Sequence, residues 1–207
     1  MLFRSINDVQ RTLNLLPGRD VWVELHNEPN LVAEGMGSSW ADGTAFRPWF
    51  LDVLSRYRTA LPGVRFLYPG LSPGGSVPGI RQDHMQFLSQ SKEAVRQADG
   101  FGAHIYWAFN FPMSTALRML DDMLTFLRDN GMSNKPVFVT EASNNKGNTT
   151  PAQKGAEYVT FWRELIARPV TKGVTYFVAS ANHPDFQEEV WVTGGGSRGI
   201  AEVVGVR

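Results

Sequence analysis

Two glutamates occupy positions suited to acid–base or nucleophilic chemistry. Glu28 lies in the segment 21–30, and Glu141 directly follows the run 136–140. Both segments contain a short apolar run, rich in β-branched residues, which is typical of a buried strand. Two carboxyl groups about 5 Å apart at the rim of one parallel sheet can hydrolyse a glycosidic bond with retention, one as acid/base and the other as nucleophile.

The elements that must position these carboxyl groups alternate along the chain. Apolar periodicity, proline and glycine stops and capping residues predict five strands and five helices. The strands are expected at 21–27, 64–68, 100–106, 136–140 and 173–179, and the helices at 5–16, 45–61, 82–98, 115–129 and 151–167. Such an alternation favours right-handed βαβ units, a parallel sheet and one α/β domain over residues 1–207.

Strand alternation gives each glutamate an expected face. Glu28 would share a face with Glu24 and His26, and Glu141 would share one with Val137 and Val139. Sites in parallel α/β folds lie at the carboxyl ends of the strands, where both glutamates are expected.

Three motifs carry a family resemblance. Residues 24–29 (Glu-Leu-His-Asn-Glu-Pro) resemble the acid/base strand of clan A glycoside hydrolases, especially the cellulase-like family 5. Residues 102–107 resemble the His-x-Tyr strand of that clan, and residues 137–141 resemble its nucleophile strand. The resemblance implies a (β/α) TIM-barrel-type fold. It also implies a retaining O-glycosyl hydrolase that cleaves a β-linked glycan by double displacement.

The resemblance also implies residue roles. Glu141 would be the nucleophile, and Glu28 would hold the proton and act as acid/base. Asn27 would bind the sugar hydroxyl next to the anomeric carbon, Tyr106 would donate to Glu141, and His104 would line the same wall.

The chain departs from the family at its last predicted strand. The family carries there a tryptophan that floors the sugar subsite, whereas residues 175–180 contain none. Trp107 and Trp191 are the candidates for that role, so both are expected to contact substrate.

The strand count differs from a complete barrel, which has eight strands and about 250 residues. Five strands correspond to strands 4 to 8 of the family fold, so we expect a truncated barrel of about five βα units. Open edge strands would favour self-association. A catalytically inactive remnant or a carbohydrate-binding protein is the alternative function.

Composition excludes several other classes. The 20 basic and 20 acidic residues balance, which gives no electrostatic case for nucleic acid or an anionic membrane; an oligo- or polysaccharide is compatible with this neutrality. Cysteine is absent and no cluster has metal-ligand spacing, so we expect neither a cofactor nor a catalytic metal. The N-terminus does not resemble a signal peptide, and the compartment stays open.

One further motif and one alternative fold are disfavoured by their sequence context. The run 194–199 fits a dinucleotide fingerprint in letters but lacks a following βαβ unit, and is predicted to be a loop. A flavodoxin-like domain is also disfavoured, because the Asn-Glu-Pro-Asn sequence after the first strand suits no phosphate.

Overall fold

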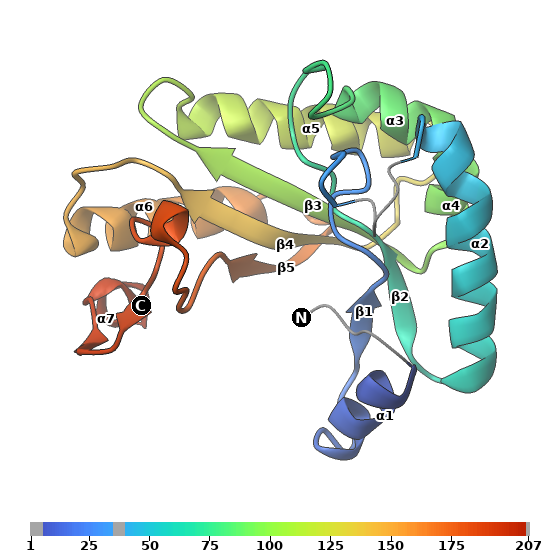
Figure 1. Ribbon diagram of the computed structural model, residues 1–207, viewed down its shortest axis with the longest axis horizontal. Coiled ribbons are helices and arrows are strands. Elements are labelled where there is room, and N and C mark those ends of the chain that lie inside the picture. Colours follow the sequence, from blue (N-terminus) through green and yellow to red (C-terminus); the bar gives the residue numbers. More distant parts are fainter. Residues whose placement is uncertain (1–5, 35–39, 206–207) are drawn as a thin grey trace. The chain divides into compact units, whose positions relative to one another are not determined.

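A computed structural model describes residues 6–34 and 40–205 of the chain (Figure 1). By its internal contacts the chain divides into two compact units, Met1–Gly102 and Ala103–Arg207. Strand β3 (Gly100–Trp107) begins in the first unit and continues into the second.

In its described residues, the first unit holds two complete strands and four helices. Its strands are β1 (Trp22–Glu24) and β2 (Arg65–Tyr68). Its helices are α1 (Ile6–Asn14), α2 (Gly43–Ala60), α3 (His84–Gln90) and α4 (Lys92–Gln97). Strand β1 pairs in parallel with β2, and β2 pairs in parallel with the start of β3.

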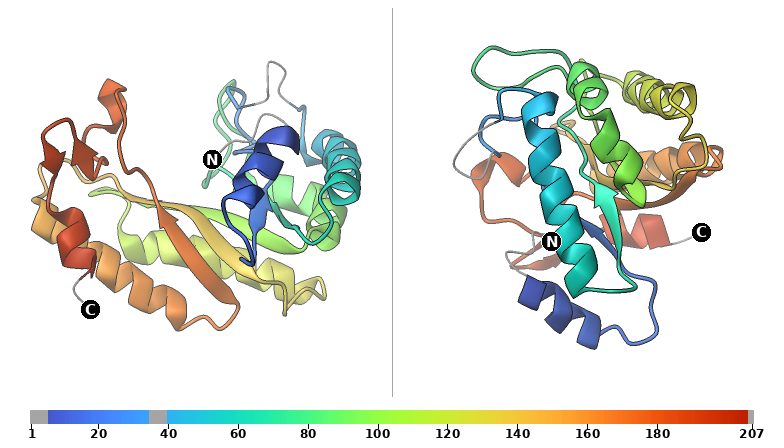
Figure 2. Two further views of the ribbon diagram at one scale, coloured as in Figure 1. Left: turned by 90° about the horizontal axis from the view of Figure 1, so that it is seen from below. Right: turned by 90° about the vertical axis from the view of Figure 1, so that its right-hand side faces the viewer.

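Helix α2 is the main cover of the first unit and lies beside α3 and α4 (Figure 2). Asp42 caps its N-terminus by accepting a hydrogen bond from the amide of Ala45 (2.9 Å). Phe46, Phe50 and Leu54 form its buried stripe at helical spacing. The predicted helix at 45–61 is therefore confirmed.

The predicted helix at 82–98 forms two helices, because the helical hydrogen bonding is interrupted at Ser91. The Ser91 side chain is fully buried, bonds back to the Phe87 carbonyl (2.8 Å) and meets the Tyr68 hydroxyl (2.7 Å). This tertiary contact replaces regular helix at that position and is invisible in the local pattern.

The second unit follows the same alternation. After β3 come α5 (Met113–Asp129), β4 (Val137–Asn144), α6 (Pro151–Ile166) and β5 (Thr171–Tyr176). A 3-10 turn (Pro184–Phe186), the hairpin β6–β7 (Val192–Thr193 and Gly196–Ser197) and α7 (Ile200–Gly205) follow. The glycine run 194–199 thus forms the turn of a hairpin and the residues after it, as predicted for a loop.

Helices α5 and α6 lie on one face of the strands of the second unit (Figure 2). Strand β3 neighbours β4, and β4 pairs in parallel with β5. A capping box starts α6 at Thr150, whose hydroxyl accepts from Gln153 N, while the Gln153 side chain accepts from Thr150 N. Parallel strands with intervening helices confirm the predicted α/β class.

Candidate active site

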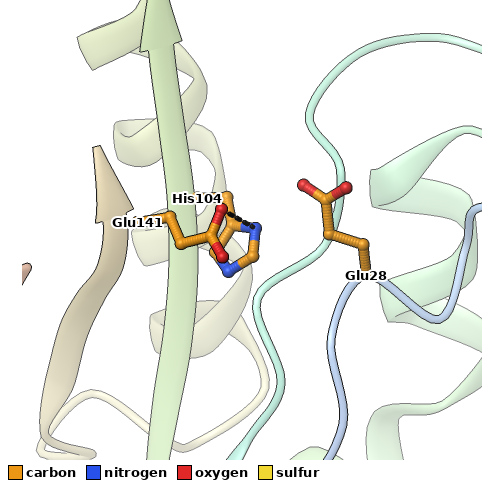
Figure 3. A group of neighbouring side chains, drawn as sticks. All are labelled: Glu28, His104 and Glu141. Carbon is orange, nitrogen blue, oxygen red and sulfur yellow. Dashed lines mark ion pairs between the residues drawn. The ribbon is translucent and has the colours of Figure 1, made fainter. Parts of the chain in front are cut away.

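Glu28 lies in a loop beyond the end of β1. The strand stops at Glu24, so the prediction that alternation places Glu28 on the face of Glu24 was wrong. The loop is fixed by other bonds: Glu28 N donates to Gly70 O (3.1 Å), and Leu31 N donates to Glu28 O (2.8 Å). Figure 3 shows the Glu28 side chain extending from this loop.

The backbone of this loop is strained on both sides of Asn27. His26 has φ 111° and Glu28 has φ 40°, a region that residues with a Cβ rarely adopt. Strain of this kind persists only where surrounding contacts hold it, and it concentrates at functional sites. The conformation presents Asn27 half-buried between two fixed neighbours.

Asn30, which no sequence motif had marked, provides several of the contacts that hold this loop. Its side chain donates to Ser72 O (2.9 Å) and Gln82 O (3.0 Å) and accepts from Ser72 N (2.9 Å). The side chain therefore ties the Glu28 loop to the segment 69–82. Its place directly after Glu28-Pro29 was the available signal, because a buried asparagine in a loop usually bonds to backbone.

His26 packs in a cage of aromatic rings. Its ring meets Trp40 and Trp49 edge-on, with centroids 5.0 and 5.4 Å away, and Phe46 at 6.1 Å. Burial lowers the pKa of His26 from its ordinary value, and the nearby polar backbone of Asn27 partly opposes this. The cage holds the residue next to Asn27 in place.

Glu141 lies in the second unit together with two of the predicted site residues. The Tyr106 hydroxyl donates to Glu141 Oε2. His104 Nδ1 lies 3.7 Å from the same oxygen, as the dashed line in Figure 3 marks. His104 is wholly buried, whereas the Glu141 side chain is 27% exposed. The carboxylate is thus contacted by Tyr106 and His104 on its buried side and is accessible to solvent on its other side. The structure brings Glu141, His104 and Tyr106 together.

Glu141 does not end its strand, because β4 continues for three residues to Asn144. The ladder to β5 shifts register between Val139 and Ala142. Such an irregularity breaks simple alternation and changes the aim of the residues within it. The predicted common face with the fully buried Val137 and Val139 therefore does not describe Glu141.

Trp107 is packed inside the second unit. It is 1% exposed, its ring stacks on Phe161 (4.9 Å between centroids), and its Nε1 donates to Glu157 Oε2 (2.7 Å). A buried indole with its N–H already bonded offers no open face to a sugar. We therefore leave Trp107 out of the proposed site.

Glu157 joins several side chains near the end of β4 and was missed by the sequence analysis. It also accepts from Asn144 Nδ2 (3.0 Å) and Lys146 Nζ (2.8 Å). Nothing in the motif pattern marked this helix residue.

Trp191 lies in the segment after β5 and is half-buried. Its ring stacks on Tyr176 (5.6 Å) and meets Tyr158 (5.2 Å). Its backbone N–H is bonded to the carbonyls of Val178 and Ala179. A role of Trp191 in substrate binding stays a prediction.

The site residues divide between the two units by sequence. Asn27 and Glu28 belong to the first unit, and His104, Tyr106 and Glu141 belong to the second.

Among the described residues, no helix is both long and apolar enough to cross a membrane.

Comparison with known proteins identifies relatives in fold alone. No protein-family model and no curated protein matches the chain. Among solved structures, it is similar to a GH128 (subgroup II) endo-beta-1,3-glucanase from Sorangium cellulosum, with 16% identity, a TM-score of 0.68, and coverage of 97% of this chain and 75% of that one.

Two further structures give the same result. A GH128 (subgroup I) endo-beta-1,3-glucanase from Amycolatopsis mediterranei, solved as a glutamate-to-alanine mutant in complex with laminaripentaose, has 17% identity and a TM-score of 0.60, and the match covers 98% of this chain and 77% of that one. XacCel5A in complex with cellopentaose has 14% identity and a TM-score of 0.58, with 97% and 78% covered. The (β/α) TIM-barrel-type fold class with five parallel strands is thereby confirmed.

Proposed function

We propose that this chain is a retaining glycoside hydrolase that acts on a β-linked glycan. The observation that carries the proposal is the setting of Glu141, whose carboxylate is bonded by the Tyr106 hydroxyl and flanked by the buried His104. Similarity of fold to β-1,3-glucanases and to a protein solved with cellopentaose supports the same class.

Glu141 is the nucleophile in this mechanism. Its carboxylate oxygen attacks the anomeric carbon and forms a covalent glycosyl ester as the glycosidic bond breaks. The Tyr106 hydroxyl holds one carboxylate oxygen, which leaves the other free to attack. His104 restricts the rotation of Glu141 from the buried side.

Glu28 is the acid/base. It gives its proton to the departing glycosidic oxygen and then takes a proton from the water that cleaves the ester. Its strained loop and the bonds of Asn30 support the role, because a proton donor must be held in one place. Asn27, next to it, binds the sugar hydroxyl adjacent to the anomeric carbon. The mechanism requires that the two carboxyl groups face one glycosidic bond about 5 Å apart.

The first substrate to test is a β-1,3-glucan, because several proteins of similar fold are β-1,3-glucanases. A β-1,4-glucan oligosaccharide is the second, since XacCel5A was solved with cellopentaose.

Release of reducing sugar from laminarin tests the proposal. Wild-type protein should hydrolyse it, and Glu28→Gln and Glu141→Gln should each lose at least about a thousandfold in kcat. Glu93→Gln, at a partly exposed position of α4, is a matched control that keeps most activity. Binding of the glucan without hydrolysis would support the inactive carbohydrate-binding alternative, and full activity in Glu141→Gln would exclude the assigned nucleophile.

A further inference from the structure

A cavity lies within the second unit, in the segment that follows β5. Its volume is about 620 Å³, which falls in the range of small-ligand sites. The walls come from the segment 180–194, and they include Ser180, Asn182, Gln187, Val190, Val192 and Thr193.

The lining of this cavity is polar but carries no charge. Hydroxyl and amide groups come from Ser180, Asn182 and Thr193, while Pro184 and Val192 add apolar surface. Neutral donors and acceptors beside apolar patches suit a sugar ring, which has hydroxyl edges and apolar C–H faces. An anionic or cationic ligand would find no counter-charge among these lining side chains.

Two of the polar side chains are free to bind a ligand. Within residues 6–34 and 40–205, the Ser180 hydroxyl and the Asn182 amide make no hydrogen bond, and both residues are exposed. Gln187 has another task, because its Nε2 donates to Ala181 O and His183 O (3.0 Å each) and so shapes the wall.

A buried lysine anchors the wall to the rest of the unit. Lys154 of α6 is fully buried, and its Nζ donates to Glu188 O (2.7 Å) and Asn144 O (2.9 Å). Arg198 Nη1 adds bonds to Gln187 O (2.6 Å) and Val190 O (3.1 Å). A charged donor on a backbone carbonyl is a strong tie, so the cavity wall is fixed before any ligand arrives.

The cavity starts close in sequence to the strand neighbour of Glu141. Tyr176 pairs with Ala142, the residue after Glu141, and Phe177 N donates to Ala142 O (2.9 Å). Ser180 follows three residues later. The cavity wall therefore continues the chain directly from the strand that pairs beside Glu141.

We propose that this cavity binds a neutral glycosyl unit and is a subsite for the glycan chain, with Asn182 as its main polar contact. The inference rests on the proposed function for the identity of the ligand. Val190 and Val192 line it, whereas Trp191 between them stacks on Tyr176, so the subsite is distinct from the aromatic contact of Trp191.

An NMR titration with laminaripentaose tests this inference in Glu141→Gln, which keeps the sugar intact. We expect shift changes at backbone amides of 180–194. Adding Asn182→Ala should raise the dissociation constant about 3–10-fold, which corresponds to the loss of one hydrogen bond. Asn134→Ala, an exposed asparagine before β4, is the matched control and should change nothing.

The outcomes separate the two proposals. Perturbation confined to residues around position 141, with equal affinity in the Asn182 and Asn134 variants, would overturn the subsite and leave the hydrolase. Perturbation at 180–194 that Asn182→Ala weakens, in a wild-type protein that does not hydrolyse laminarin, would support the subsite and remove the hydrolase. Absence of any binding at millimolar laminaripentaose would overturn the subsite.

Discussion

At the residue scale, the tyrosine hydroxyl on Glu141 is the contact most closely tied to the proposed chemistry. A hydrogen bond to a carboxylate stabilises it and fixes its rotamer. The motif spacing already placed Tyr106 and His104 on one strand face, and the structure brings both to Glu141.

Tyr106→Phe should lower kcat on laminarin about 10–100-fold with little change in KM, because it removes one charge-assisted hydrogen bond and keeps the ring. Steady-state kinetics measure the effect. Tyr57→Phe, on helix α2 of the first unit, serves as control. Unchanged kcat in Tyr106→Phe would contradict the role given to the hydroxyl.

His26 gives a prediction about pH and stability. Burial lowers its pKa below its ordinary value of 6.5, so the unfolded chain takes up a proton at a higher pH than the folded chain does. The stability contributed by neutral His26 is therefore present above about pH 6.5, and it is lost progressively as the pH falls from there through the lowered folded pKa.

Urea unfolding at a series of pH values measures this loss. His26→Phe keeps an aromatic ring in the cage without a titrating group, so its stability should fall less steeply below pH 6.5 than that of wild type. Parallel curves for the two proteins would show that His26 does not contribute.

At the element scale, local signals predicted the helices and non-local contacts decided the exceptions. The capping box at Thr150 and the buried apolar stripe of α2 depend on residues within one or two helical turns of each other, so they could be predicted. The helix interruption at Ser91 depends on Tyr68, which is 23 residues away in sequence, and the conformation of the Glu28 loop depends on Gly70. Neither feature could be predicted from local sequence.

The cap of α2 should be measurable. Asp42→Ala should destabilise the protein by about 1 kcal/mol, because it leaves the Ala45 amide without its acceptor. Asp42→Asn, which keeps an acceptor oxygen, should cost much less. Equal loss in both variants, measured by urea unfolding, would assign the effect to charge and not to the cap.

Gly102 in β3 should tolerate no side chain. A Cβ there would overlap Glu24 Oε1 and would lie 2.9 Å from Gly70 N and 3.0 Å from Tyr68 O, two backbone atoms. Glu24 is itself held by a bond from Gly70 N (2.6 Å). Gly102→Ala should therefore destabilise the protein by about 1–3 kcal/mol.

Gly147→Ala is the matched control, because no atom lies within 4 Å of a Cβ at that position. It should change stability little. If thermal unfolding showed that Gly102→Ala and Gly147→Ala are equally stable, this result would contradict the close packing described around Glu24.

At the scale of the whole molecule, the fold class could be predicted because the strand–helix alternation runs along the entire chain. Of the candidate site, three motifs marked Glu28, His104, Tyr106 and Glu141, and the last three come together in the structure. The cavity after β5 could not be predicted, because its wall depends on bonds from Lys154 and Arg198 to backbone carbonyls that no motif encodes.

The most direct test of the proposed mechanism is trapping of the covalent intermediate with an activated fluorosugar derived from a β-1,3-linked glucan disaccharide. Mass spectrometry of the digested protein should show one added glycosyl group on the peptide that contains Glu141, and none in Glu141→Gln. A protein that turns over laminarin yet carries the label on another residue, or releases product of inverted configuration, would contradict Glu141 as the nucleophile of a retaining hydrolase.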